Sequence, residues 1–203
     1  MNLTALAINC TLKSGKKRSS TEKLLNEICE QLGKQSVHSE IVRAADYSVL
    51  PGVEHDEGKG DEWPQLLEKI KACDIFILGT PIWLGQPSSI AKRVCERMDA
   101  FLDDTDERKR MISYNKVACV AVVGNEDGAH HVSAELYQAL NDVGFSLAPA
   151  ALTYWVGLAM GDTNYNELDH APRKTSEATE MMVLNAVHLA QALKSCPYPG
   201  KQK

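Results

Sequence analysis

A basic, hydroxyl-rich stretch follows the first apolar run of the sequence. Residues 16–18 read Lys-Lys-Arg and residues 19–21 read Ser-Ser-Thr, directly before a helical pattern. Cations, hydroxyls and the free N–H groups of a helix N-terminus all favour an anion, and phosphate is the obvious guest. The simpler alternative is that Ser20 or Thr21 caps the helix while the cations are solvated. This stretch alone leaves both interpretations open.

Two later stretches also follow apolar runs. Residues 80–89 read TPIWLGQPSS and residues 124–131 read GNEDGAHH. The first combines a rigid turn, an aromatic surface at Trp83 and free backbone groups, which suit a planar heteroaromatic ring. We therefore interpret Trp83 as the wall of a site and not as a core residue. Because ligands of parallel sheets sit at the carboxyl ends of the strands, the three stretches are expected to meet there.

Familiar phosphate-binding and phosphorylation motifs are excluded. Aligning Gly15 and Lys16 with the end of a P-loop puts Cys10 where the first glycine belongs. No G-x-G-x-x-G follows the first strand, so a Rossmann dinucleotide site lacks its glycines. A response-regulator receiver needs carboxylates at the ends of the first and third strands, where this chain has Asn-Cys at 9–10 and Gly-Thr at 79–80.

Six cysteines are scattered along the chain, without a C-x-x-C pair or a neighbouring histidine at metal-ligand spacing. We predict free thiols and no metal site. Cys10 lies at a strand end that faces the proposed site, but no partner base is evident, so a catalytic role for it has little support. The three stretches contain no convincing triad or carboxylate pair, and we predict no catalytic residue supplied by the protein.

Apolar periodicity predicts five strands that alternate with five helices. Such βα units imply a doubly wound, five-stranded parallel sheet with right-handed crossovers. The predicted strands are 3–8, 37–42, 74–79, 116–123 and about 146–154, and the predicted helices are about 24–33, 66–72, 90–102, 132–143 and 182–193.

Length and composition predict one α/β domain. The chain has 203 residues, of which 44% are hydrophobic, so a single domain over residues 1–203 can bury a sizeable core. The charged stretches 53–61 and 103–115 are interpreted as surface loops and not as linkers. The tail from about residue 195 to 203 is expected to be flexible.

The net charge and the hydropathy of the chain exclude some classes of binding partner. A formal net charge of −5 argues against general nucleic-acid binding. The N-terminal run lacks the features of a leader, and no apolar stretch reaches the roughly 20 residues that a membrane helix needs. We therefore expect a cytoplasmic protein without a membrane or nucleic-acid partner.

The motif after the third strand resembles the flavodoxin-like FMN family. In its NAD(P)H-dependent FMN reductase and quinone reductase branch, the corresponding loop reads Gly-[ST]-Pro-[IVT]-aromatic, as GTPIW does at 79–83. The stretches SSTEKLL (19–25), SSIAKRVCERMDAF (88–101) and VVGNEDGAHH (122–131) extend the resemblance over most of the chain. It implies a flavodoxin-like sheet with strand order 2-1-3-4-5. Relatives with an iron–sulfur centre carry a compact cysteine cluster that this chain lacks.

The resemblance also implies a division of labour in binding FMN. One group of residues would hold the phosphate, a second would line the isoalloxazine, and a third would flank the ring from the other side. These groups are, in order, Ser19, Ser20 and Thr21 with Thr11 and Lys13 closing over them; Pro81, Ile82, Trp83, Leu84 and Gly85; and Gly124, Asn125, Glu126, Asp127 and Gly128, with His131 in reach.

The implied activity is transfer of electrons from NADH or NADPH through FMN to a small acceptor such as a quinone. The flavin carries that chemistry, which agrees with the lack of a catalytic dyad. The resemblance further implies a homodimer. Two alternatives stay open: a flavodoxin-type electron carrier that acts on a protein partner, and a binding or sensing domain of the same fold without a cofactor.

Overall fold

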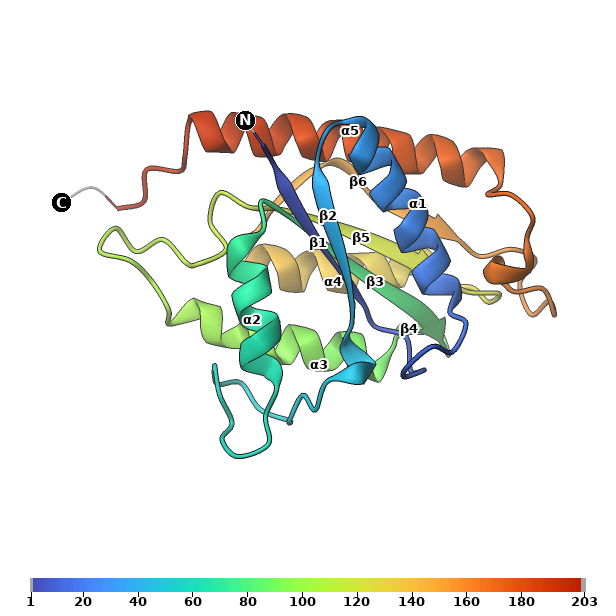
Figure 1. Ribbon diagram of the computed structural model, residues 1–203, viewed down its shortest axis with the longest axis horizontal. Helices are drawn as coiled ribbons and strands as arrows, with labels where there is room; N and C mark the ends of the chain where they lie inside the picture. Colours follow the sequence, from blue (N-terminus) through green and yellow to red (C-terminus); the bar gives the residue numbers. More distant parts are fainter. Residues whose placement is uncertain (1, 202–203) are drawn as a thin grey trace.

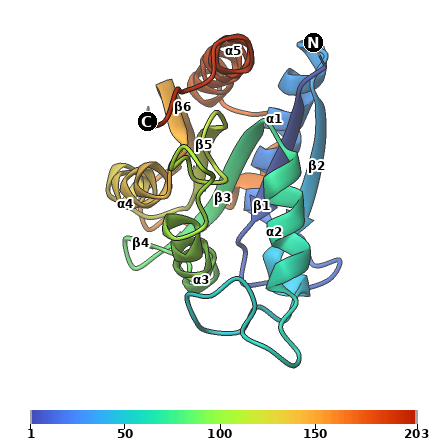
Figure 2. The same ribbon diagram turned by 90° about the vertical axis from the view of Figure 1, so that its left-hand side faces the viewer.

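The computed structural model describes residues 2–201 and shows a central sheet between two helical layers (Figures 1 and 2). Five parallel strands lie in the order β2-β1-β3-β5-β6, which confirms the predicted order. A two-residue strand, β4, pairs antiparallel with β3 and was not predicted. The strands are β1 (Thr4–Asn9), β2 (His38–Arg43), β3 (Ile75–Trp83), β4 (Gln86–Pro87), β5 (Val117–Val123) and β6 (Ser146–Trp155).

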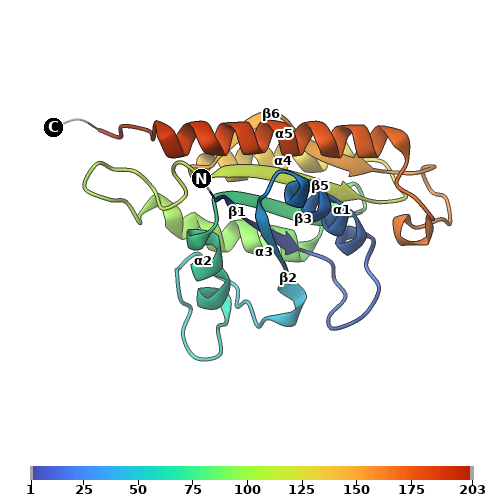
Figure 3. The same ribbon diagram turned by 45° about the horizontal axis from the view of Figure 1, so that its top comes forward.

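Helices cover both faces of the sheet. Alternate residues of a strand point to opposite faces, so Leu6 and Ile8 of β1 enter one core cluster while Ala5 and Ala7 enter the other. The first cluster packs under α2 (Trp63–Ala72), α3 (Ser89–Met98) and α4 (Ala129–Asp142), and the second under α1 (Ser20–Lys34) and α5 (Arg173–Ser195). Figure 3 shows α5 running along the length of the molecule. The 3₁₀ turns are η1 (Ala44–Asp46), η2 (Asp99–Leu102) and η3 (Tyr165–Glu167).

β3 is longer than its apolar pattern predicts. The expected end was Gly79, but Thr80 and Pro81 stay paired with β5. The chain then turns at Leu84 and Gly85, whose φ values of 53° and 72° are typical of a tight hairpin turn. The TPIW motif is therefore the end of a strand and one arm of the β3–β4 hairpin, and not a loop.

All five helices have boundaries that differ from the prediction, and α5 begins at Arg173, nine residues before its expected start. α3 ends at Met98, and the residues expected to complete it form η2. α4 begins at Ala129, three residues before the expected start, so that its first turn carries His130 and His131. α2 begins at Trp63, where a proline in the first turn costs no hydrogen bond.

The segment between η1 and α2 closes over a buried ion pair. Arg97 of α3 is fully buried and lies 2.7 Å from the Asp61 carboxylate, which is also fully buried. Its guanidinium donates to the carbonyl oxygens of Leu50 at 3.0 Å and Glu54 at 2.7 Å, and it lies 5.5 Å from the ring centroid of Trp63. A stretch that looks like a charged surface loop is therefore anchored from inside.

Residues 196–201, which follow α5, lie on the opposite side of the molecule from the carboxyl ends of the strands (Figure 1). Tyr198 exchanges a hydrogen bond with Ser146 at 3.0 Å, and the Lys201 N–H donates to the carbonyl of Arg108. The single-domain division and the flexibility of the tail stay predictions. Across residues 2–201, no helix combines the length and apolar character that crossing a membrane requires.

Candidate functional site

A narrow cavity of about 120 Å³ opens where β1, β3, β5 and β6 end. The three stretches expected to meet do meet here, together with the segment after β6, which lies at this same end of the sheet (Figure 1). Cavities that enclose a drug-sized ligand usually measure about 300 Å³ or more. A flavin nucleotide bound here would therefore lie partly outside the cavity.

Ten of the predicted site residues line this cavity. Five lining residues were not assigned to it from the sequence. The predicted lining residues are Thr11, Lys13, Ser19, Ser20, Thr21, Pro81, Ile82, Trp83, Gly124 and Asn125, and the additional ones are Leu12, Val123, Trp155, Asn164 and Tyr165.

The remaining predicted residues are not among those that line the cavity. The Leu84 N–H donates to the Glu126 carboxylate at 3.1 Å, which ties the hairpin turn to the loop after β5. Gly128 has a φ of 122°, and a Cβ there would lie 2.9 Å from the Cα of Gly85, so the two loops touch through their glycines. These four residues support the hairpin and do not face the cavity, and Asp127 is exposed.

His131 lies on the outer side of the hairpin. Its Nε2 is 2.9 Å from Nε2 of Gln86 and 2.9 Å from the carboxylate of Glu135. The imidazole is therefore engaged with neighbouring surface side chains and is not among the groups lining the cavity. A flavin contact from His131 stays a prediction.

The three hydroxyls at the start of α1 have different partners. Ser19 is the N-cap, since its Oγ accepts the Glu22 N–H at 3.2 Å. The cap was expected at Ser20 or Thr21, but Ser20 Oγ instead accepts the Asn166 N–H at 3.3 Å. The capping and phosphate interpretations are therefore compatible, because all three side chains line the cavity beside the first amides of the helix.

Arg43, at the end of β2, holds the loop that leads to those hydroxyls. It is only 7% exposed. Its Nη1 donates to the carbonyl oxygens of Lys13 (3.2 Å), Gly15 (2.5 Å) and Lys17 (3.0 Å), and its Nη2 pairs with the Glu22 carboxylate at 2.6 Å. This residue is not predicted from the sequence, because an arginine that ends a strand carries no local sign of burial.

Some of the cationic side chains of the first loop donate hydrogen bonds to backbone carbonyls of the protein. Lys13 Nζ donates to the Arg18 carbonyl at 3.2 Å, across its own loop. Arg18 Nη2 donates to the carbonyl of Asn166 at 2.8 Å. Lys16 and Lys17 are exposed. The loop is therefore tied at both ends, while the ammonium groups at its tip face solvent.

Residues 164–168, which we call the strap, close the cavity over α1. Tyr165 is fully buried, its ring centroid lies 5.4 Å from that of Trp155, and its hydroxyl donates to the Glu27 carboxylate. Lys23 lies 5.3 Å from the same ring and donates to the carbonyl of Leu168. Burial, followed by the hydrogen bond to Glu27, raises the pKa of Tyr165, which therefore stays a neutral donor. The sequence signal for the strap is the long irregular stretch 157–171, which follows the last predicted strand.

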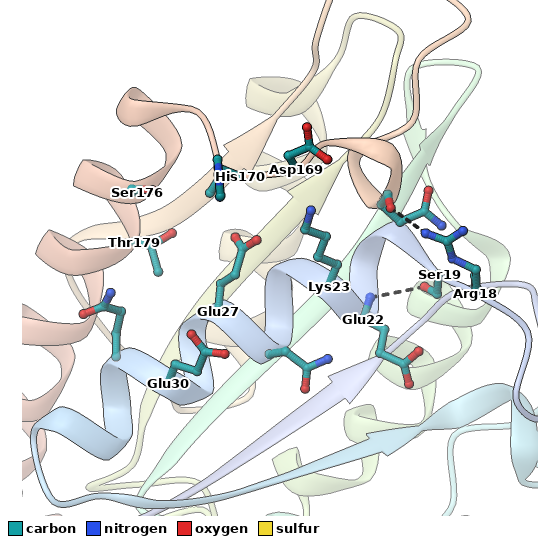
Figure 4. A pocket seen from close by; sticks show the side chains of 14 residues that line it. Arg18, Ser19, Glu22, Lys23, Glu27, Glu30, Asp169, His170, Ser176 and Thr179 are labelled. Carbon is teal, nitrogen blue, oxygen red and sulfur yellow. Dashed lines mark hydrogen bonds between the residues drawn. The ribbon is translucent and has the colours of Figure 1, made fainter.

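A larger hollow of about 640 Å³ lies on the other side of the strap, between α1 and α5. Figure 4 shows Lys23 and Glu27 projecting from α1 toward the segment that carries Asp169 and His170. Burial raises the pKa of Glu27 despite its hydrogen bond from Tyr165. This hollow is wider, but it mixes acids with bases along two helices, whereas the narrower cavity has the position expected of a ligand site in a parallel sheet.

Cys10 is unsuited to covalent chemistry. Its side chain is completely buried, and burial, reinforced by Cys95, raises the pKa of its thiol well above the usual value. A thiol of this kind stays protonated and is not a nucleophile. All six cysteines are free.

The donor groups at the cavity suit a flavin phosphate. The cavity lining includes the hydroxyl-bearing first turn of α1, and hydroxyls with first-turn amides are the donor set that binds phosphate at helix N-termini. Pro81, Ile82 and the half-exposed Trp83 add an apolar surface to the same lining. Both kinds of surface that FMN requires are therefore present in one cavity.

Comparison with known proteins agrees with this arrangement. The family model described as NADPH-dependent FMN reductase matches residues 3–157. The 8-demethyl-8-aminoriboflavin-5'-phosphate synthase of Streptomyces davaonensis is 34% identical over 208 residues, which cover 98% of this chain and 81% of that protein. The strap lies beyond the residues matched by the family model but within the span shared with that relative.

Solved structures show the same fold. The crystal structure of RosB with the bound intermediate 8-demethyl-8-formylriboflavin-5'-phosphate matches with a TM-score of 0.86 and 34% identity, covering 97% of this chain and 82% of that one. A flavodoxin from the domain Archaea matches with a TM-score of 0.60 at 7% identity, covering 93% and 99% of the two chains. The fold is therefore flavodoxin-like.

Proposed function

The chain belongs to the NADPH-dependent FMN reductase family, and from that premise we propose that it uses FMN to pass electrons from NADH or NADPH to a small acceptor such as a quinone. The observation that carries this proposal is the meeting of two surfaces in one cavity. The hydroxyl-bearing N-terminus of α1 and the Trp83 arm of the hairpin both line it. Membership of the family supports an FMN-dependent oxidoreductase, while the donor and the acceptor are our proposal.

The protein's own part in this reaction is binding and orientation. Ser20 and Thr21, with the first amides of α1, would hold the phosphate, and Pro81 and Trp83 would line the ring. The strap, through Tyr165, would exclude water from the inner wall. When bound, FMN supplies the redox chemistry by accepting a hydride from the nicotinamide and delivering electrons to the acceptor.

An absorbance titration followed by turnover tests the proposal. The purified protein is titrated with FMN, then mixed with NADH or NADPH and a quinone. We expect saturable FMN binding and nicotinamide oxidation that depends on the quinone. Full loading with FMN but no oxidation with either nucleotide and several acceptors would contradict the proposed reaction while leaving FMN binding intact.

A second candidate function is chemical change of the flavin itself. Its support is the 34% identity over 98% of this chain to a synthase named for a modified riboflavin 5'-phosphate. In that case the same cavity would hold the flavin phosphate as a substrate and not as a resident cofactor. The two candidates share the ligand and differ in its fate.

Mass spectrometry of the flavin separates these two candidates. After prolonged turnover with NADH or NADPH and quinone, the protein is denatured and the mass of the released flavin is measured. An unchanged FMN mass together with many acceptor turnovers supports the reductase. A new flavin mass that appears in proportion to time supports the modifying enzyme.

Assembly and partners also belong to the proposal. A homodimer is supported by three large apolar side chains that are more than 80% exposed near the cavity mouth, Leu84, Leu158 and Met160. Light scattering over the micromolar range tests it, and a monomeric mass throughout would contradict it. A protein partner that takes electrons from the flavin, as in a flavodoxin-type carrier, is the alternative to a small acceptor, and the cytoplasmic location stays a prediction.

A further inference from the structure

We propose that Arg43 is a positioning residue that folds the first loop into a preformed phosphate cradle. This inference rests on the proposed binding of FMN and goes beyond it by naming the group that gives the site its preference for a phosphorylated flavin. Arg43 belongs to β2 and is not among the residues that line the cavity. It acts through the backbone of the loop that it holds.

The carbonyl contacts of Arg43 carry the argument. Three carbonyl oxygens from the five residues Lys13 to Lys17 converge on one guanidinium nitrogen. An oxygen bound to Arg43 cannot at the same time line an anion site, where its partial negative charge would repel a phosphate. The loop therefore enters α1 with these repulsive groups turned inward before any ligand arrives.

The tip of the loop is fixed from a second direction. The Gly15 N–H donates to the Asp46 carboxylate at 2.5 Å, and Gly15 has a φ of 64°, a conformation that glycine adopts without strain. Both the N–H and the C=O of this residue are thus bound to side chains that lie 31 and 28 residues later in the sequence. An exposed, lysine-rich loop gains a defined backbone in this way.

Charge provides a second role for the same group. Glu22 lies in the first turn of α1, close to the hydroxyls, and a carboxylate there would oppose a bound phosphate. Arg43 pairs with that carboxylate at 2.6 Å. The Glu22 N–H meanwhile donates to Ser19, so one residue connects the arginine to the cap of the helix.

The test uses a pair of substitutions that leaves the net charge unchanged. Replacing Arg43 alone removes a positive charge near the phosphate, and a loss of affinity would then have two explanations. The double variant R43M/E22Q removes one charge of each sign and keeps side chains of similar length. The dissociation constants of FMN and riboflavin are measured by fluorescence titration for the wild type and for R43M/E22Q.

We expect the double variant to weaken FMN at least about tenfold and riboflavin less than about threefold, because a loosened loop must be ordered at the expense of phosphate binding. The single variant E22Q, which keeps the carbonyl contacts of Arg43, should bind FMN as tightly as the wild type or more tightly. If the double variant keeps the wild-type ratio of FMN to riboflavin affinity, the inference is overturned.

A matched pair elsewhere in the chain controls for general loosening. The variant R97M/D61N removes the other buried arginine with its carboxylate and should leave the FMN to riboflavin ratio unchanged, even where it lowers the melting temperature. If this pair changes the ratio as much as R43M/E22Q does, the effect is not specific to the first loop and the inference fails.

A second variant and the wild-type measurement distinguish failure of this inference from misfolding and from failure of the proposed function. If R43M/E22Q does not fold, the variant R43K retains the charge but offers one ammonium in place of a two-armed guanidinium, and it should still weaken FMN several-fold more than riboflavin. An unchanged ratio in R43K then overturns the inference. If the wild-type protein binds neither flavin, both the proposed function and this inference are overturned. If the wild-type protein prefers FMN, the proposed binding of FMN stands whatever the variants show.

Discussion

Two arginines, Arg97 and Arg43, each hold an irregular segment of the chain in place, but their surroundings differ. Each is buried, donates to several carbonyl oxygens of one irregular segment and pairs with one carboxylate. The partner of Arg97 is Asp61, which is fully buried, whereas the partner of Arg43 is Glu22, whose side chain is 38% exposed. The ion pair of Arg97 is closed on all sides, whereas the pair of Arg43 is reached by solvent at its carboxylate.

The difference teaches what an internal guanidinium can be used for. Around Arg97 the carbonyls, the carboxylate and the face of Trp63 leave nothing for a ligand to contact, so the anchor secures a loop and no more. Around Arg43 the held loop continues directly into the capped start of α1, which lines the cavity. Loss of the first anchor should affect stability, and loss of the second should affect ligand choice.

The largest effect is expected from Asp61→Asn. This change leaves the buried Arg97 guanidinium without a counter-charge, which typically costs about 3–5 kcal/mol in the free energy of unfolding. Urea denaturation measures the loss. Glu40→Gln, which breaks the exposed pair of Glu40 with Lys69, serves as the control and should change stability little. A loss as small as that of the control would show that water reaches Arg97.

The next effect is on the ligand side of the comparison. The double variant S20A/T21A should weaken FMN at least about tenfold, or about 1.4 kcal/mol, because each hydrogen bond to a charged group contributes roughly 1.5–3 kcal/mol. Riboflavin, which has no phosphate, should lose little, while Trp83→Ala should weaken both. Titrations in which FMN binds the double variant as tightly as the wild type would reduce this loop to a capped helix start.

Acid should weaken the ion pair between Asp61 and Arg97, and with it the stability of the fold, over a defined pH range. Burial alone would raise the pKa of Asp61, but hydrogen bonds from Arg97 and from the N–H groups of Glu57, Trp63 and Leu50 together hold it well below its usual range. A carboxyl with a lowered pKa in the folded state contributes stability above its unfolded pKa, near about 4, and loses it as the pH falls further. We expect a slope of up to about 1.4 kcal/mol per pH unit there.

Unfolding free energies measured at steps from pH 5 downward check this expectation. The wild type should lose stability steeply below about pH 4, and the Asp61→Asn variant should lack that part of the slope. Equal slopes in the two proteins would mean that Asp61 titrates at its ordinary pKa.

The smallest effect is expected from Glu22→Gln. Because the Glu22 side chain is 38% exposed, its pairing with Arg43 should contribute less than about 1 kcal/mol to stability. The carbonyl contacts of Arg43 remain in this variant. A loss as large as that of Asp61→Asn would erase the distinction between the two anchors.

The sequence predicts what depends on neighbouring residues. The strands and the hydroxyl-rich start of α1 follow from apolar periodicity and from cap chemistry, which are local signals. The strand order, in contrast, was implied by the resemblance to the flavodoxin-like FMN family. The apolar surface at Trp83 was likewise recognised from one short motif. These features place the cavity at the correct end of the sheet.

Contacts between distant segments escaped prediction. The carbonyl partners of Arg43 lie 26 to 30 residues away from it, and the Leu50 carbonyl lies 47 residues from Arg97. Nothing in the local pattern distinguishes either arginine from a solvated one. Tyr165 was missed for the same reason, since its hydroxyl donates to Glu27 on a helix 138 residues earlier.

The three tryptophans divide between the two regions and give each its own optical signal. Trp63 is fully buried beside Arg97, whereas Trp83 and Trp155 line the cavity. A flavin bound in that cavity would quench the two indoles beside it most strongly, while the emission of Trp63 would shift when its own loop opens and exposes the indole to water. Intrinsic fluorescence would therefore respond both to occupancy and to unfolding, without any added label.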